Sequence, residues 1–580
     1  LVLIIAAFYH FRGIGWGIPD PERISLVLGS REKAEQLIPV LEELHQEIEE
    51  SIPYYGHPYP TSYQPDKPVK VVLSSKKIIT TKDTLNAIRS YLLRSYGADE
   101  HRALVALSRM NPGKWQFDPR FYEYGGAYLY PLAVFLKVCS WFRFIRLSPN
   151  MSFYLQFPEE MGKIFAAARA FGGIGALLAI LFFSLLMRRL LANRLHSFLL
   201  SACFSVMPVF VLWSFHLKPF SFAIIWVALT LYFVCEYQEK QQTFSIWLAS
   251  IWAGLAMGTV LSYGYIFWGV ILAIVFWSSY PAKRRRLFIQ GSLLFLTTFI
   301  LTNPYAICHW REFVQEILFL RKYWHTGGIR ENFTFFFRYT LLAGIGLPLY
   351  IIFGLSIGFN LLYRREQTDW FWLFFLLPGW LYFACVTGYW MHYSFFLYPV
   401  LVIITARSLS KLRMGTGLNL LFTLVTIWTA AYTYTLTQLY RGENVRTLAG
   451  RWINQTIPPG DRIGMSESPS PWRTPPFRFL DYHLVIAPFP SSLPNVQKPT
   501  WFITCQEVWG RGSSLAEVKK SLAQFEVVAT FQKVPVFFGR RWPMTEKIPY
   551  DLCHPNPLIH IWHRKTTRME KDGDSGLPSD

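Results

Sequence analysis

The stretch IFAAARAFGGIGALLAILFFSLLM, residues 164–187, contains a single charged side chain, that of Arg169. A helix needs about 20 mostly apolar residues to cross a bilayer, so this stretch predicts a transmembrane helix. Further apolar stretches lie at residues 1–18, 197–215, 219–236, 244–261, 264–280, 287–303, 334–362, 370–388, 395–410 and 417–437. The sequence therefore predicts an α-helical polytopic membrane protein with about eleven spans.

The composition of the whole chain agrees with this prediction. Of the 580 residues, 52% are hydrophobic and 16% are charged, whereas a soluble domain is about 25% charged. The apolar and aromatic content excludes an intrinsically disordered chain, and the length exceeds what one soluble core holds. The cysteines include no CxxC pair, which argues against a disulfide framework or a zinc ribbon.

The chain opens with Leu1 inside an apolar run. Two interpretations of residues 1–18 are open, a truncated first transmembrane helix and a signal peptide. No small-residue cleavage site follows, which favours the helix.

The basic residues between the predicted spans indicate the orientation in the membrane. They follow the second, sixth, eighth and tenth spans, at Arg188, Arg189 and Arg194, at Lys283–Arg286, at Arg364 and Arg365, and at Lys411 and Arg413. If the spans alternate, these loops share one side, which the positive-inside rule makes cytoplasmic. We therefore expect a multi-pass protein of the cytoplasmic (inner) membrane. These loops also explain the net charge of +20, so the charge does not indicate a nucleic-acid partner.

Three segments are expected on the outer side, namely residues 19–160, residues 304–333 and the chain after residue 440. In the first, Pro39–Ser51 and Thr81–Tyr96 predict amphipathic helices, with Gly97 as the stop signal of the second. Residues 1–440 are thus expected to form the transmembrane domain, with 19–160 as its long outer loop. HLVIAPF (483–489), PTWFITC (499–505), EVVATFQ (526–532) and PLIHIWHRK (557–565) predict strands, and SLAEVKKSLAQF (514–525) predicts a helix. Residues 441–565 should form a small α/β domain, and residues 566–580 a disordered tail.

Residues 96–131, YGADEHRALVALSRMNPGKWQFDPRFYEYGGAYLYP, carry the strongest chemical signal. Asp99 and Glu100 start a predicted helix on the outer face, which ends near Asn111-Pro112 and leads into an aromatic segment. A carboxylate beside the outer leaflet can act as a general base on an acceptor hydroxyl or amine. The alternative is structural, with Asp99 as the helix N-cap and Glu100 favouring the helix dipole.

Further motifs follow this segment in a fixed order. They are Tyr124–Pro131, Arg169 in an Ala/Gly-rich helix, Lys218-Pro219 in a short outer turn, GLAMGTVLSYGY (254–265) with Tyr263, TNPYAICHWREF from residue 302 onward with His309, and His392-Tyr393. In order and sidedness this set resembles lipid-dependent glycosyltransferases of the C-type superfamily, such as protein O-mannosyltransferases and the lipid A aminoarabinose transferase. The resemblance covers most of residues 96–465.

The resemblance implies a sugar donor on a polyprenyl phosphate and inverting transfer to a lipid, glycan or protein acceptor. It implies Asp99 as the catalytic base with Glu100 beside it, and Arg169 and Lys218 as partners of the leaving phosphate, since cations stabilise phosphate. Tyr124, Tyr263, His309 and His392 are the other substrate-binding candidates. No nucleotide cofactor is implied, and a divalent metal is left open.

The sequence departs from this family in three places. The acidic motif lies about eighty residues beyond the first span, whereas family members carry it soon after that span. Asp20, directly after the first span, is therefore a rival for the catalytic role. Lys-Pro-Asp is replaced by Lys218-Pro219-Phe220, and the Lys-Tyr of the family by Ser262-Tyr263.

Each candidate also has a structural alternative. Arg169 and Lys218 could anchor at the membrane interface by snorkelling, and His309 could belong to a solvated basic loop. For the whole chain, the alternative function is a transporter or flippase, although internal repeats are not evident. The sequence lacks GxGxxG, GxxxxGK[ST] and HExxH, and its DxD, Asp572–Asp574, lies in the predicted tail. A nucleotide-sugar donor with a metal-binding DxD is therefore not expected.

Overall fold

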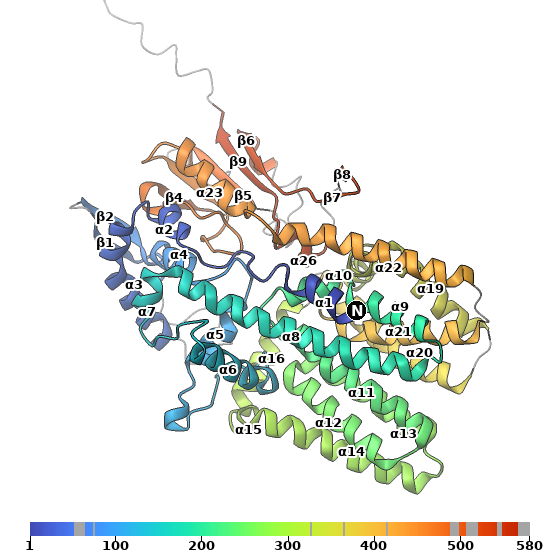
Figure 1. Cartoon of the computed structure of the whole chain (residues 1–580). Helices are drawn as coiled ribbons and strands as arrows, with labels where there is room; N and C mark the ends of the chain where they lie inside the picture. Colours follow the sequence, from blue (N-terminus) through green and yellow to red (C-terminus); the bar gives the residue numbers. More distant parts are fainter. Residues whose placement is uncertain are drawn as a thin grey trace, which may run out of the picture.

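The computed structural model describes residues 1–51, 64–73, 76–324, 328–363, 366–412, 416–487, 498–505, 520–541 and 548–565. Long helices form one body of the molecule, and two outer segments lie at one end of it (Figure 1). One outer segment runs from α2 to α7, and the other is the C-terminal sheet with α23. The predicted fold class, a helical polytopic protein with a large first outer loop and a small C-terminal α/β domain, is confirmed.

Every stretch predicted to span the membrane contains a helix. The helices are α1 (Val2–Phe11), α8 (Pro158–Leu190), α9 (Arg194–Ser205), α10 (Pro208–Ser214), α11 (Phe220–Lys240), α12 (Thr243–Thr259), α13 (Ile266–Trp277), α14 (Pro281–Thr302), α17 (Ile329–Phe335), α18 (Leu341–Ile345), α19 (Leu347–Leu362), α20 (Gln367–Val386), α21 (Tyr398–Lys411) and α22 (Thr416–Thr437). In the described part of the chain, four helical segments are long and apolar enough to cross a membrane, or up to six if each of two bent pairs is one span. The count of about eleven spans therefore stays a prediction, while the positions of the helices are as expected.

The two bent pairs break at residues that cannot continue a helix. Pro208 opens α10, where the axis turns by 51°, because proline cannot donate the backbone hydrogen bond. Gly346 has a φ of 82° between α18 and α19, and the helices on its two sides meet at 116°. Glycine adopts this left-handed conformation without a steric cost.

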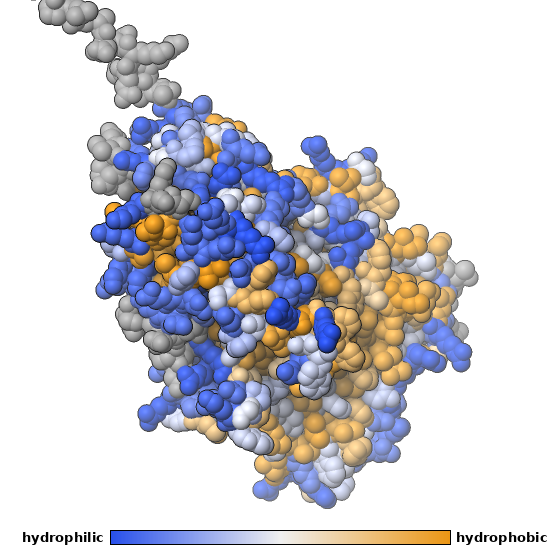
Figure 2. All heavy atoms as spheres, turned by 60° about the vertical axis from the view of Figure 1, so that its left-hand side comes forward, coloured by the Kyte–Doolittle hydropathy of each residue, from blue (hydrophilic) through white to orange (hydrophobic). Residues whose placement is uncertain are grey.

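The surface of the helical body is apolar. Hydrophobic side chains gather over it, whereas hydrophilic ones cover the outer segments (Figure 2). Leu181 and Leu185 of α8, Leu293 of α14 and Leu424 of α22 are among its exposed large side chains. In water such exposure is unfavourable, so this surface fits contact with lipid acyl chains.

The first outer segment contains a hairpin that the sequence analysis missed. Its elements are α2 (Glu22–Val27), α3 (Arg31–Ser51), β1 (Pro68–Leu73), β2 (Lys76–Thr81), α4 (Lys82–Leu93), α5 (Glu100–Ser108), the short 3-10 helix at Pro112–Lys114, α6 (Gly126–Trp141) and α7 (Met151–Gln156). Both predicted amphipathic helices are present within α3 and α4, but α4 ends four residues before the expected stop at Gly97. β1 and β2 pair antiparallel.

The C-terminal segment has the predicted α/β character. Helix α23 (Val445–Thr456) precedes a sheet of order β4-β3-β5-β9-β6. The predicted strands are confirmed as β4 (His483–Ile486), β5 (Trp501–Cys505), β6 (Phe525–Phe531) and β9 (Ile559–Arg564), and β3 (Arg462–Met465) was not predicted. The predicted helix 514–525 lies mostly outside the described residues, as does the tail 566–580.

A short helix, α26 (Tyr550–Cys553), lies between β6 and β9 along the chain. The backbone N–H of Tyr550 donates to the carbonyl of Tyr389, in the turn between α20 and α21, at 3.3 Å. The C-terminal domain therefore contacts the turn between α20 and α21 through α26.

Candidate functional site

Asp99 and Glu100 are neighbours in sequence but have opposite environments. Asp99 has a φ of 60°, a left-handed conformation that Asp tolerates better than most residues, and α5 begins directly after it. The side chain of Glu100 is 0% exposed, whereas that of Asp99 is 37% exposed. The backbone turn thus sends one carboxylate into the protein and leaves the other accessible.

The Glu100 carboxylate is fully engaged by protein groups. Arg169 donates from Nε to Oε1 at 3.1 Å and from Nη2 to Oε2 at 2.6 Å. The Leu217 N–H donates to Oε1 at 2.8 Å, the Ser95 hydroxyl donates to Oε2, and His216 Nδ1 lies 3.4 Å from Oε1. Burial alone would raise the pKa of Glu100, but Arg169 and His216 hold it well below its usual value. Glu100 therefore joins α5, α8 and the turn that precedes α11.

Arg169 has no nitrogen left without a protein acceptor. Besides its two bonds to Glu100, its Nη1 donates to the carbonyl oxygens of Ile14 and Trp16 at 2.9 and 2.5 Å. The side chain is completely buried. The predicted contact of Arg169 with a donor phosphate is untested, but in this arrangement the guanidinium fixes Glu100 and the backbone that follows α1.

Asp99 belongs to a second, more open set of charges. Arg102 Nε lies 3.1 Å from Asp99 Oδ1, and Arg102 Nη1 donates to Glu123 Oε2 at 2.9 Å. The Asp99 side chain accepts no capping hydrogen bond from α5, so the capping alternative is not observed. Desolvation would raise the pKa of Asp99, but Arg102, followed by Lys218, lowers it well below its usual value. Asp99 is therefore ionised at neutral pH.

A third carboxylate reaches this set from the segment that follows α14. Glu316, on α16 (Trp310–Trp324), accepts hydrogen bonds from the N–H groups of Tyr122 and Glu123 at 3.0 to 3.2 Å. Burial, and then repulsion from Glu123, raises the pKa of Glu316 to about 7. Burial also raises the pKa of Glu123. Glu316 therefore changes its charge near neutral pH.

Lys218 is a cation that has no acidic partner among the described residues. It lies half-buried in the turn before α11, with its ammonium 5.4 Å from the ring centre of Trp213. Within the residues that the structure describes, the ammonium makes no hydrogen bond or ion pair. Its charge lowers the pKa values of Asp99 and His392, and it opposes the raised pKa of Glu123.

His392 is buried in the turn between α20 and α21. Its ring centre lies 4.0 Å from that of Trp213 and 4.5 Å from that of Phe220. His392 Nδ1 lies 2.9 Å from Asp551 Oδ1, and Asp551 Oδ2 accepts from the Met391 N–H at 2.8 Å. Burial lowers the pKa of His392, Asp551 opposes this effect, and Lys218 adds to it. His392 and Lys218 therefore both lie against the ring of Trp213.

Tyr124 lies on the side of the Tyr-rich segment that faces α14. Its hydroxyl is buried and, among the described residues, has no hydrogen-bond partner. Gly125 and Gly126 follow, and a Cβ atom on either would lie about 2 Å from a carbonyl oxygen, that of Gly258 or Thr302. The glycines therefore allow this segment to approach α12 and α14, where Asn303 Oδ1 accepts from the Gly126 N–H at 2.8 Å.

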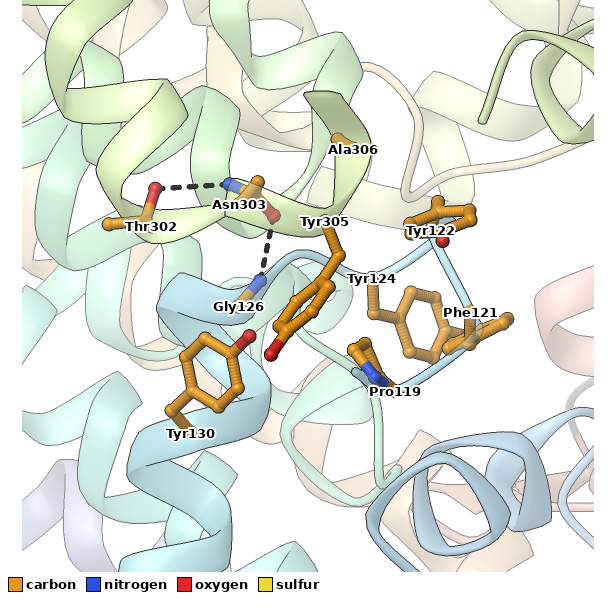
Figure 3. A pocket seen from close by; sticks show the side chains of 10 residues that line it. All are labelled: Pro119, Phe121, Tyr122, Tyr124, Gly126, Tyr130, Thr302, Asn303, Tyr305 and Ala306. Atoms are coloured by element: carbon orange, nitrogen blue, oxygen red, sulfur yellow. Dashed lines mark hydrogen bonds between the residues drawn. The ribbon is translucent and has the colours of Figure 1, made fainter. Parts of the chain in front are cut away.

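A small pocket opens at this junction (Figure 3). It encloses about 210 Å³ of empty space, its open mouth included. Its lining is largely aromatic and consists of Pro119, Phe121, Tyr122, Tyr124, Gly126, Tyr130, Thr302, Asn303, Tyr305 and Ala306. Tyr130 and Tyr305 point toward one another across it (Figure 3).

The other candidates lie around these groups. Tyr263 is buried against Phe220 and Phe396, with a hydroxyl that has no partner in the described ranges. His309 is partly exposed, and its Nε2 lies 3.4 Å from Asp118. Asp20 is exposed and accepts from the Arg23 N–H at the start of α2. No hydrogen bond or ion pair among the described residues joins Asp20 to the Asp99 set.

Sequence reasoning missed several polar members of the site, among them Arg102, Glu123, Glu316 and Asp551. Arg102 and Glu123 lie inside the quoted segment 96–131, so the spacing of three residues from Asp99 to Arg102 on a helix could have indicated that pair. Glu316 and Asp551 lie 194 and 159 residues from their partners. Nothing in the local sequence reveals such contacts. In the described part of the chain, no group of three or more His, Cys, Asp and Glu side chains is arranged to hold a metal ion.

No protein-family model matches the sequence, and no curated protein does. Among solved structures, the chain is similar to the oligosaccharyltransferase of Archaeoglobus fulgidus tethered with an acceptor peptide, with 11% identity, 74% of this chain and 67% of that chain covered, and a TM-score of 0.43. It is also similar to ArnT of Cupriavidus metallidurans bound to undecaprenyl phosphate, with 12% identity, 82% and 95% covered, and a TM-score of 0.41. At these values the likeness is one of fold and assigns no activity or residue role to this chain.

Proposed function

We propose that this chain is an integral-membrane glycosyltransferase. Its donor is a sugar on a polyprenyl phosphate, and its acceptor is a hydroxyl or amine of a lipid, glycan or protein on the outer face of the cytoplasmic membrane. The proposal rests on the order of motifs in the sequence and on one observation. An accessible, ionised carboxylate, Asp99, lies in one charge set with a cation, Lys218, that has no acidic partner among the described residues.

The chemistry needs these two groups. The acceptor gives its proton to an Asp99 carboxylate oxygen as its oxygen or nitrogen bonds to the anomeric carbon. The bond from that carbon to the phosphate oxygen breaks, and its electron pair leaves with the polyprenyl phosphate. Lys218 neutralises the charge that develops there. Attack opposite the leaving phosphate inverts the anomeric configuration.

Lys218 also links donor binding to the basicity of Asp99. Without donor, its charge helps to lower the pKa of Asp99 and so makes Asp99 a weak base. A donor phosphate paired with Lys218 offsets that charge. Asp99 is therefore a stronger base in the donor-bound protein than in the donor-free protein. It then takes a proton from the acceptor when the donor is present to react.

The remaining candidates take supporting roles in this proposal. Glu100 and Arg169 position the Asp99 turn from inside the protein, since their polar atoms are used by protein partners. Tyr124, Tyr263, His309 and His392 line the surroundings of the donor and acceptor. Asp20 makes no hydrogen bond or ion pair with the charge set among the described residues, so it is the second choice for the base.

The test is a donor screen with purified protein in lipid nanodiscs. Radiolabelled sugars on undecaprenyl phosphate are supplied with and without acceptor amines and alcohols, and both release and transfer of the sugar are measured. We expect release or transfer that disappears in Asp99→Asn. Transport of the labelled lipid across proteoliposomes without any sugar release would instead establish the transporter alternative.

The proposed sidedness can be tested separately by cysteine labelling. In a Cys308→Ser background, which removes the exposed native thiol, an impermeant maleimide should label a cysteine at Glu526 of β6 in intact cells. A cysteine at Arg285, near the start of α14, should react only after the membrane is opened. The reverse pattern rejects the orientation.

A further inference from the structure

The C-terminal domain contributes side chains to the site from residues 549–556. Five side chains of this segment are at least 91% buried, namely Asp551, Leu552, Cys553, His554 and Asn556. The segment is short, and its helix α26 has only 4 residues. The segment lies between two parts of the site. On one side it meets the α20–α21 turn, and on the other it meets the loop that carries Asp99.

The contact with the Asp99 loop is made by His554. The Ala98 N–H donates to His554 Nε2 at 2.7 Å, directly before the left-handed residue Asp99. The His554 carbonyl in turn accepts from Arg446 of α23 at 2.9 Å. The position of the Asp99 loop is therefore tied to the C-terminal domain.

The contact with the α20–α21 turn is made by Asp551. Its two carboxylate oxygens accept from His392 Nδ1 and from the Met391 N–H. A carboxylate accepts only, so Nδ1 carries the proton and Nε2 of the neutral ring carries a lone pair. No described residue donates to Nε2. The ring is packed beside Trp213, the same aromatic wall that lies below Lys218.

We propose that Asp551 is a positioning residue that fixes the tautomer of His392, so that Nε2 accepts a hydrogen bond from a hydroxyl group of the donor sugar. This inference rests on the proposed function. Lys218 and His392 then bind different parts of the donor, because the ammonium attracts the phosphate and the neutral imidazole binds the sugar. Trp213 offers an apolar face to the sugar ring between them.

The variant Asp551→Asn separates these contributions. Asparagine has nearly the same shape and its Oδ1 can still accept from the Met391 N–H, so the turn keeps its cap. Its NH₂ group would face Nδ1, which forces the proton of His392 onto Nε2 and removes the acceptor. The matched control is Asp461→Asn, another aspartate of the C-terminal domain, which accepts from Trp501 Nε1 at 2.8 Å.

The experiment measures binding of two probes to protein in nanodiscs. The first probe is undecaprenyl phosphate, and the second is a set of undecaprenyl-phosphate sugars carrying glucose, mannose or arabinose. We expect Asp551→Asn to weaken binding of the sugar-bearing donor about three- to tenfold, the effect of one neutral hydrogen bond, and to leave undecaprenyl phosphate unchanged. KM for the donor should rise by the same factor with little change in kcat. Asp461→Asn should change neither.

A double-mutant cycle tests whether Asp551 acts through His392. His392→Gln leaves the Asp551–Met391 contact in place, so it should reproduce the loss, and Asp551→Asn should add nothing to it. Three results would overturn the inference: Asp551→Asn weakens both probes equally, the two substitutions have additive effects, or a folded Asp551→Asn binds both probes like the wild type. In each case, sugar transfer by the wild type would leave the proposed function standing. A wild type that binds neither probe and transfers no sugar overturns both.

Discussion

The surroundings of Glu100 and of Asp99 differ in how completely the protein satisfies their charges. Around Glu100, every oxygen has a donor and the partner Arg169 is equally occupied. Around Asp99, the carboxylate is accessible, Arg102 is shared with Glu123, and Lys218 lacks a counter-ion in the described residues. A closed charge set stabilises a fold, whereas an open one can bind and react. Residue type alone does not distinguish the two.

The largest effect should come from Asp99→Asn. This change removes the proposed base and keeps the shape, so turnover should fall by about 10²- to 10⁴-fold. Turnover of the donor found in the screen is measured together with the melting temperature. The control is Asp481→Asn, a surface carboxylate 3.8 Å from Lys33, which should leave turnover unchanged. A folded Asp99→Asn with normal turnover would move the test to Asp20→Asn.

The next effect concerns the closed set. Arg169→Ala leaves the buried carboxylate of Glu100 without its cation, so the free energy of unfolding should fall by about 3–5 kcal/mol. Arg451→Ala breaks two partly exposed ion pairs, with Glu22 and Glu443, and each should contribute at most about 1 kcal/mol. Chemical unfolding in detergent measures both. If Arg169→Ala is as stable as the wild type but loses affinity for undecaprenyl phosphate, Arg169 binds the donor. The charges around Glu100 would then not be satisfied by the protein alone.

A third effect depends on pH and concerns the raised acids beside the open set. The pKa of Glu316 is raised from 4.5 to about 7, so its native carboxyl keeps a proton over a range where the unfolded chain loses it. The stability contribution is complete below about pH 4.5 and is lost as the pH rises through 7, so the free energy of unfolding should decrease by ~1–3 kcal/mol across this window. Glu316→Gln should remove that decrease. Glu312→Gln, on the same helix, should retain it, and equal pH curves for wild type and Glu316→Gln would contradict the assignment.

The smallest effect should come from Lys218→Gln. Loss of one charged contact, ~1.5 kcal/mol, should weaken undecaprenyl phosphate about tenfold, and Lys218→Arg should restore part of it. Lys163→Gln, whose ammonium pairs with Glu160 at the surface, is the control. Unchanged affinity in Lys218→Gln would mean that the cation only anchors the turn against Trp213.

Hydropathy located the membrane helices because a membrane span is an apolar stretch of about 20 residues, which the sequence shows directly. A break at Pro208 or Gly346 bends a span but does not change its composition. Alternating strands such as β5 and β9 were equally visible. The hairpin β1–β2 was missed because a Pro-rich and Lys-rich context hides its alternation. Asp99, Lys218 and His392 were found as separate motifs. Grouping these three residues in one site required their partners Glu316 and Asp551. These partners are distant in sequence and come near only in the folded chain.

The bond between Ala98 and His554 sets an order of events during biosynthesis. These residues are 456 positions apart, so at a synthesis rate of about 5–20 residues per second the Asp99 loop emerges roughly 20–90 s before its partner. His392 likewise precedes Asp551 by 159 positions. The nascent chain therefore passes through a period in which its membrane helices are inserted and its C-terminal domain is unfinished. Any molecule truncated before residue 549 would remain in that immature condition permanently.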